Sequence, residues 1–216
     1  MSKKEGILKD HPVKRKILNA AIEVFAEKGF AGARMDEIAL HAGINKAMLY
    51  YHIGHKEDLY SAVLLDVIGG AWKKISEKIE GGGTSEEKLA AITRGIAQAA
   101  KSTRHFPRLI LREWAAGGVH LPKAVLEELA GIFQVVRGIL EKGAREGSFR
   151  KVDPLMTHLC ILASIMVLSA AEPIRQRFKS AGIKSMPQSK FPIDIAGHVA
   201  EIVLHGIKSK PAKKGK

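Results

Sequence analysis

Side chains that can donate hydrogen bonds gather between residues 45 and 56 of this 216-residue chain. Lys46 can donate to guanine O6 or N7, and Met48 can touch a thymine methyl group in the major groove of DNA. Four donors long enough to reach phosphate oxygens follow: Tyr50, Tyr51, His52 and Lys56. Phosphate contacts position a protein on DNA, and base contacts specify the sequence that it reads. These residue types therefore predict a DNA-reading surface.

Two short helices are expected to hold these side chains, over residues 35–41 and 45–52. The three residues between them leave room only for a tight turn between crossed helices, which predicts a helix-turn-helix. The first residues of the second helix reach deepest into the groove. Lys46, Ala47 and Met48 are therefore the expected base readers, while Asn45 is expected mainly to cap the helix. The residues expected to face a first helix are Ile38, Ala39, Ile44, Leu49 and Ile53.

Several of these residues also have a structural interpretation. Tyr50 could be partly core, and Lys46 and Lys56 could be ordinary solvated lysines, although the surrounding pattern favours binding. His52 and His55 lie three residues apart, but no carboxylate or thiol cluster accompanies them, so we expect no metal site. We also expect no cofactor and no enzymatic activity, because the sequence has no nucleophile elbow, phosphate-binding glycine loop or zinc-protease motif.

The net charge of +13 favours an anionic partner, but its distribution matters more. Residues 1–60 carry 10 Lys and Arg against 8 Asp and Glu, so bulk charge cannot explain DNA binding by this part of the chain. Residues 208–216 carry five lysines and no acid, and we expect a disordered tail that is attracted to polyanions. The one cysteine, Cys160, excludes an internal disulfide and is expected to be buried.

We expect a cytoplasmic protein without membrane contact, because the amino-terminal residues lack the apolar stretch of a signal peptide. The longest uncharged run, residues 155–171, is at the short limit for crossing a bilayer and contains Thr, His and two Ser. We interpret it as a buried helix.

Hydrophobic residues repeat at helical spacing throughout, so the chain is predicted to be all-α. The first helix is expected over residues 12–28, where Gly29 supplies a stop that needs positive φ. Further helices are expected over residues 56–80, 85–102, 154–171 and 192–207, and two more begin near Pro107 and Pro122. The predicted division is a DNA-binding domain over residues 1–55, a larger helical domain over 56–207 and the tail over 208–216.

The amino-terminal quarter resembles the TetR family of transcriptional regulators. The shared residues are Ile17-Leu18, Ala21, Phe25, Gly29, Ile38-Ala39, Ala42-Gly43-Ile44, Leu49-Tyr50 and Lys56-Glu57-Asp58-Leu59. The chain departs from the family where a small hydroxyl residue usually caps the first motif helix and touches phosphate. Arg34 or Met35 stands there, and both are counted among the candidate DNA-binding residues. Ile53 replaces the usual Phe, and His55 stands where Ser or Asn often caps the next helix.

The resemblance implies that the carboxy-terminal helical domain binds a small-molecule inducer and forms a homodimer. The regulator is then expected to be a repressor that binds a near-palindromic operator and is released by the inducer. The dimer is expected through the helices at about 154–171 and 192–207. Candidate ligand-binding residues are polar or aromatic residues within apolar helices: Trp72, Phe106, Glu113, Trp114, Phe133, Gln134, Arg137 and His158. A helical carrier protein that does not bind DNA is the remaining alternative.

Overall fold

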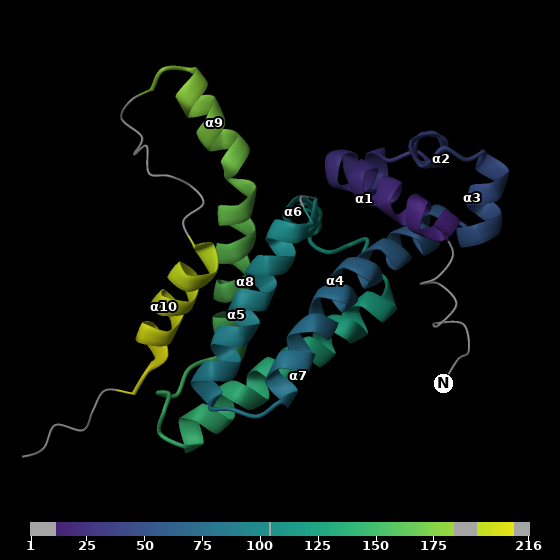
Figure 1. The fold of residues 1–216 in the computed structure, drawn as a ribbon. Coiled ribbons are helices and arrows are strands. Elements are labelled where there is room, and N and C mark those ends of the chain that lie inside the picture. Colours follow the sequence, from purple (N-terminus) through teal and green to yellow (C-terminus); the bar gives the residue numbers. More distant parts are fainter. Residues whose placement is uncertain (1–11, 104, 184–193, 210–216) are drawn as a thin grey trace, which may run out of the picture. The chain divides into compact units, whose positions relative to one another are not determined.

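The computed structural model describes residues 12–103, 105–183 and 194–209. These residues form ten α-helices, and their one β-type pairing is an isolated bridge between Phe149 and Lys208 (Figure 1). The helices are α1 Pro12–Gly32, α2 Met35–Ala42, α3 Lys46–Ile53, α4 Lys56–Glu80, α5 Ser85–Ser102, α6 Phe106–Ala115, α7 Lys123–Arg145, α8 Pro154–Ala170, α9 Glu172–Ser180 and α10 Ile195–Ile207. The prediction of an all-α fold is confirmed.

Local sequence signals determine several helix ends. Gly29 has φ 72° and ψ 176°, so it interrupts the helical backbone of α1 at the predicted stop. Thr84 and Glu87 form the capping box of α5, since the Thr84 hydroxyl accepts from the Glu87 N–H and the Glu87 carboxylate accepts from the Thr84 N–H. Asp153 caps α8 by accepting from the Met156 N–H at 2.7 Å. Helix α9 was not predicted.

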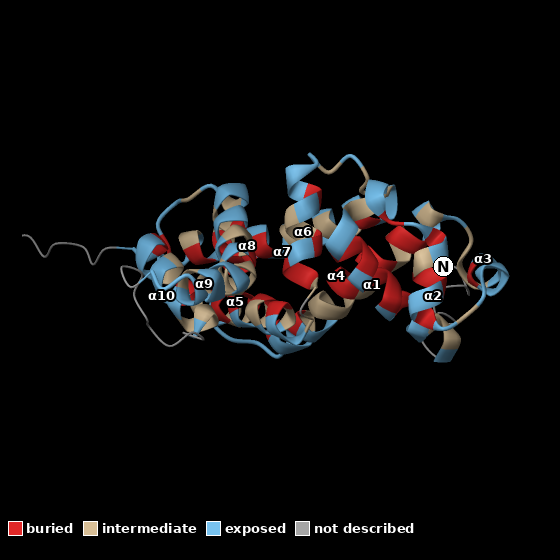
Figure 2. Cartoon of the chain, turned by 90° about the horizontal axis from the view of Figure 1, so that it is seen from above, coloured by how far each residue is buried: buried red, intermediate tan, exposed pale blue. Residues whose placement is uncertain are grey.

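The chain divides into two compact units. The first contains the described residues up to Gly70 together with residues 105–128, so it combines α1, α2, α3, the start of α4, α6 and the start of α7. Its core is aliphatic and aromatic, and the fully buried side chains include Ile17, Phe25, Ile38, Leu49, Leu59, Tyr60 and Leu64. Figure 2 shows buried residues along α1 and an α3 that is mostly exposed.

The second unit contains the remainder of α4, residues 71–80, and the greater part of α7, together with α5, α8, α9 and α10. Helices α5, α8 and α10 pack against one another (Figure 1). Their shared core contains Leu89, Ile92, Ile161, Ile165, Met166, Val199 and Ala200. Arg150 holds the carboxyl end of α10, because its backbone N–H donates to the Ile207 carbonyl at 2.8 Å and its Nε donates to the Gly206 carbonyl at 2.7 Å.

This division places α6 in the same unit as the predicted DNA-binding helices, whereas the sequence assigned it to the larger domain. Ordered structure also extends beyond the predicted tail boundary at residue 208. Lys208 pairs with Glu86 at 2.9 Å, and the Ser209 N–H donates to the Ser148 carbonyl at 3.1 Å. Residues 210–216, and positions 192 and 193 of the last predicted helix, lie outside the described residues.

Helix α8 is only partly buried within the single chain. Its inner face buries Ile161, Ile165 and Met166, but Leu155, Met156, Leu159 and Val167 are exposed. Cys160, which was expected to be buried, is also exposed in the single chain. By length and composition, the stretch Pro154–Ser180 could cross a membrane. Core helices of soluble proteins can meet the same test.

Candidate nucleic-acid interface

The turn between α2 and α3 depends on Gly43. This residue has φ 66° and ψ 36°, in the left-handed region that side chains with a Cβ disfavour. Its N–H donates to the Leu40 carbonyl at 3.1 Å, and the Ile44 N–H donates to the Ala39 carbonyl at 3.0 Å. These two hydrogen bonds close the end of α2 and turn the chain directly into α3.

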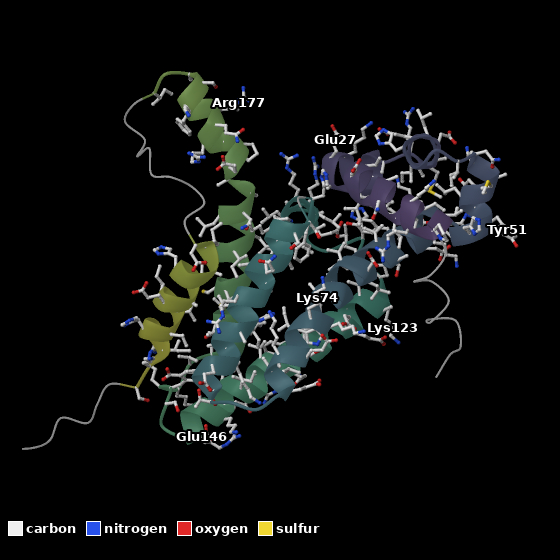
Figure 3. All side chains as sticks on the ribbon, viewed as in Figure 1. Glu27, Tyr51, Lys74, Lys123, Glu146 and Arg177 are labelled. Carbon is white, nitrogen blue, oxygen red and sulfur yellow. The ribbon has the colours of Figure 1, made fainter. Side chains whose placement is uncertain are left out.

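Helix α3 begins at the cap that the sequence predicted. The Asn45 Oδ1 accepts from the Met48 N–H at 2.8 Å, which uses the Asn45 side chain within the protein. Leu49 is fully buried and is the one buried residue of α3, whereas Lys46, Ala47 and Met48 are exposed. Tyr51 is 86% exposed and points away from the helix bundle (Figure 3). The helix therefore presents its amino-terminal turn and Tyr51 to solvent.

Lys46, the expected reader of guanine, has a partner in the free protein. Its Nζ lies 2.7 Å from Asp36 Oδ1 in the first turn of α2, and both side chains are largely exposed. The hydrogen bond to Asp36, and then its negative charge, raise the pKa of Lys46. The ammonium group is therefore charged at neutral pH. No motif in the sequence pointed to Asp36.

The side chains expected to contact phosphates differ in their exposure and in the contacts that they make within the protein. Tyr50 is 38% exposed, and its ring lies edge-on to His55 with centroids 6.1 Å apart. His52 is half-buried, with its ring 5.2 Å from that of Tyr51. Lys56 donates to the Ala31 carbonyl at 3.3 Å, and its Nζ lies 4.7 Å from the centroid of the Phe30 ring. Lys56 thus also holds the end of α1 against the start of α4.

The two candidate DNA-binding residues at the start of α2 differ in exposure. Arg34 is exposed at the N-cap position, where its side chain makes no capping hydrogen bond. Met35 is buried at 8% exposure, so its side chain belongs to the core and is not available for the DNA contact that was expected of it. At the start of α4, the capping group is Asp58 instead of residue 55, because the Asp58 carboxylate accepts from the His55 N–H at 2.8 Å.

Helix α6 supports the first unit through two neighbouring charged residues. Arg112 donates from Nε to the Ala26 carbonyl at 2.9 Å and from a terminal nitrogen to the Glu27 carbonyl, so it caps the carboxyl end of the main segment of α1. Glu113 is 3% exposed and accepts from the buried Tyr60 hydroxyl at 2.6 Å. Burial, followed by the bond to Glu113, raises the pKa of the Tyr60 phenol.

The candidate ligand-binding residues fall into both units. Phe106, Glu113 and Trp114 belong to the first unit, whereas Trp72, Phe133, Gln134, Arg137 and His158 belong to the second. The Glu113 carboxylate accepts the hydrogen bond of the Tyr60 hydroxyl within the protein, which argues against its expected role in binding a ligand. Trp114, Gln134 and Arg137 are exposed, and Arg137 pairs with Glu141 at 2.7 Å.

One pair from that set does meet within the second unit. The rings of Phe133 and His158 have centroids 6.1 Å apart. His158 is buried, and its Nδ1 has no hydrogen-bond partner among the described residues. Burial lowers the pKa of His158, so the imidazole is neutral at pH 7.

Two family models match the sequence. The model described as bacterial regulatory proteins of the tetR family covers residues 17–63, and that of the tetracyclin repressor-like C-terminal domain covers residues 82–169. Among curated proteins, the HTH-type transcriptional repressor NicS of Pseudomonas putida is 31% identical over 149 residues, which are 68% of this chain and 69% of NicS.

Solved structures share the fold. The regulator FadR of Bacillus subtilis, in complex with stearoyl-CoA, matches with a TM-score of 0.69 and 21% identity, over 89% of this chain and 98% of that one. AibR, in complex with isovaleryl coenzyme A and operator DNA, matches with a TM-score of 0.67 and 18% identity, over 90% of this chain and 97% of that one.

Proposed function

The chain belongs to the TetR family of bacterial regulatory proteins, and we propose that its helix α3 docks in the major groove of its operator. As a member of this family, it is a ligand-responsive, DNA-binding transcriptional regulator. The exposed first turn of α3 carries this proposal, because only Leu49 of this helix is buried. Lys46, Ala47 and Met48 then face base edges, with Tyr51 beside the phosphates. The remaining expected phosphate contacts are Arg34, Tyr50, His52 and Lys56. No catalytic step is assigned to the chain.

The test is binding to a near-palindromic sequence from the promoter region of its own gene, measured by fluorescence anisotropy at several salt concentrations. Tyr51→Phe removes one exposed hydroxyl and should weaken specific binding about 5-fold, since a hydrogen bond contributes about 1 kcal/mol. The slope of affinity against salt should not change, because tyrosine is neutral. Lys74→Ala is the control, because Lys74 is an exposed lysine of the second unit. Full-strength binding by Tyr51→Phe and Tyr51→Ala would show that α3 does not dock in this way.

We further propose that two copies pair through α8 and α10, which would match the two-fold symmetry of a palindrome. The support is the exposed apolar face of α8, at Leu155, Met156, Leu159 and Val167, and the exposed Ile202 of α10. A second copy of the chain would cover this surface, which is larger than scattered surface leucines would produce. We place the resulting dimer in the cytoplasm.

Cys160 provides a direct assay for this interface, because it is the only cysteine in the chain and lies on the exposed side of α8. A thiol reagent should react slowly with Cys160 in the dimer and faster when the protein is diluted. Leu159→Asp should yield a monomer with a reactive thiol, as measured by light scattering and thiol labelling. Leu126→Asp is the matched control, since Leu126 is an exposed leucine of α7 in the first unit. A dimer that tolerates Leu159→Asp would place the interface elsewhere.

For the inducer, we propose acyl thioesters of coenzyme A as the class to test first. The support is that two proteins of the same fold hold such molecules, stearoyl-CoA in FadR and isovaleryl-CoA in AibR. The mode of regulation proposed is repression, with release when the ligand favours the state that does not bind DNA. Short-chain and long-chain acyl-CoA should release the operator at micromolar concentration, whereas free coenzyme A should not. Equal release by free coenzyme A, or release by neither thioester, would exclude this class.

A further inference from the structure

Asp36 is an unexpected residue beside a surface that binds a polyanion. Its side chain is 68% exposed, and its carboxylate lies 2.7 Å from Lys46 Nζ, at the start of α3. Phosphates repel a carboxylate, so an acid in this position weakens non-specific binding to DNA. Its placement beside a base-reading lysine is consistent with a role in which the carboxylate contacts a base instead of the backbone.

The neighbouring acid shows that this placement is not a general property of the turn. Glu37 is also in the first turn of α2, but its carboxylate pairs with Lys28 of α1 at 2.5 Å. Glu37 therefore helps to hold α2 against α1, whereas Asp36 turns toward α3. The two acids have the same charge and adjacent positions, but only Asp36 contacts a residue that is expected to enter the groove.

A lysine and a carboxylate held together present a donor and an acceptor side by side. A G·C pair offers the complement in the major groove: guanine O6 and N7 accept, and the cytosine N4 amino group donates. Guanine O6 and cytosine N4 are themselves hydrogen-bonded, at about 2.9 Å, which is close to the 2.7 Å between Lys46 Nζ and Asp36 Oδ1. The pair on the protein and the pair on the DNA therefore have matching spacing.

An A·T pair fits this arrangement less well. Adenine N6 donates and thymine O4 accepts at a similar spacing, but thymine O4 has the C5-methyl group beside it, whereas guanine O6 has a second acceptor, N7, for the three donors of an ammonium group. Carboxylates accept from cytosine N4 in the recognised base contacts, and lysine favours guanine. The chemistry thus favours G·C over A·T at this position.

We propose that Asp36 and Lys46 act as one unit that reads a G·C base pair in each half of the operator, with Lys46 donating to guanine and Asp36 accepting from cytosine. This rests on the proposed docking of α3 in the major groove. It makes Asp36 a specificity-determining residue, which lowers affinity for DNA in general and raises discrimination at one base pair.

The experiment selects binding sites from a randomised DNA library with the wild-type chain and with Asp36→Ala, Asp36→Asn and Lys46→Ala. The wild type should enrich a palindrome with a fixed G·C pair at one symmetric position. Asp36→Ala should lose that preference by about 5-fold or more, within the range of a good base contact, while other positions keep theirs. Its affinity for unrelated DNA should rise, because one negative charge is removed. Circular dichroism checks that each variant is folded.

Glu37→Ala is the matched control, because it removes the same charge from the adjacent position. It should leave every base preference unchanged. If Asp36→Ala and Asp36→Asn both select the same site as the wild type, or if the position that responds is A·T, the assignment is wrong while the proposed docking stands. If the wild type enriches no sequence, the proposed function itself fails.

Discussion

Replacing Tyr60 with phenylalanine removes one buried donor and leaves the packing of the ring intact. The Tyr60 hydroxyl donates to Glu113 Oε1 at 2.6 Å, and the two residues are 1% and 3% exposed. Hydrogen bonds to charged groups contribute about 1.5–3 kcal/mol to stability. Because both side chains are buried, little water can reach them to replace the hydrogen bond that is lost. His120 Nδ1 is 3.4 Å from the same oxygen, which is too long to substitute fully. We expect Tyr60→Phe to lower the free energy of unfolding by about 2 kcal/mol.

Urea unfolding followed by circular dichroism measures this loss. Tyr51→Phe removes a hydroxyl that is exposed and should change stability by less than about 0.5 kcal/mol. Glu113→Gln keeps an acceptor for the Tyr60 hydroxyl and removes the buried carboxylate, so it should lower the free energy of unfolding by less than Tyr60→Phe does. A Tyr60→Phe protein as stable as Tyr51→Phe would refute the importance of this bond.

The same bond predicts a pH effect. The pKa of Tyr60 is raised above its ordinary value of 10.0, first by burial and then by Glu113. The unfolded chain therefore loses the phenol proton before the folded one. This stabilisation is complete below pH 10 and is lost as pH rises beyond it. Tyr60→Phe should remove that part of the alkaline loss of stability.

Three further changes follow from contacts in the two units. Burial lowers the pKa of His158 below its ordinary 6.5, so its contribution to stability is complete above pH 6.5 and is lost as pH falls below it. His158→Gln should reduce the drop in melting temperature between pH 7.5 and 5.5. Gly143→Ala would place its Cβ in steric conflict with the buried Phe149 ring, and we expect a loss of about 1–3 kcal/mol in the free energy of unfolding, measured with urea. Gly138→Ala in the same helix has open space, and it should be neutral or stabilising. Arg112→Ala leaves the Ala26 and Glu27 carbonyls without their cap and should cost about 1–2 kcal/mol in the same assay, whereas an unchanged midpoint would show that water replaces the cap.

Features set by neighbouring residues were predictable from the sequence. The Asn45 cap, the positive φ of Gly29 and the capping box of Thr84 and Glu87 each depend on a few adjacent positions. The same is true of the alternation between the buried Leu49 and its exposed neighbours. These local rules were sufficient to place α3 and the side chains it presents.

Features set by distant residues were not predictable in this way. Tyr60 and Glu113 are 53 positions apart, so no spacing rule connects them, and Glu113 was expected to bind a ligand instead. Arg112 joins α6 to α1 across 86 positions. Both bonds place α6 in the first unit and explain why the compact units differ from the predicted division at residue 55.

Helix α9 was not predicted either, because its residues carry little hydrophobic signal. It has no buried residues, and its nine residues carry only Ile174 and Phe178 as large apolar side chains at helical spacing, so its apolar stripe is shorter than those of the longer helices. Its first turn is held locally by Glu172, whose carboxylate accepts from Arg175 at 2.7 Å and from Gln176 at 3.0 Å. A helix that depends on such pairs leaves little trace in a hydrophobic pattern.

Helix α3 contributes a single side chain, Leu49, to the core of the protein. Its other positions can therefore change in evolution or in the laboratory with little effect on folding, since exposed substitutions usually cost less than about 0.5 kcal/mol. Selection for a new target sequence can act on Lys46, Ala47, Met48 and Tyr51 almost independently of selection for stability. The regulator can thus acquire a new set of target genes while its carboxy-terminal helical domain remains the same.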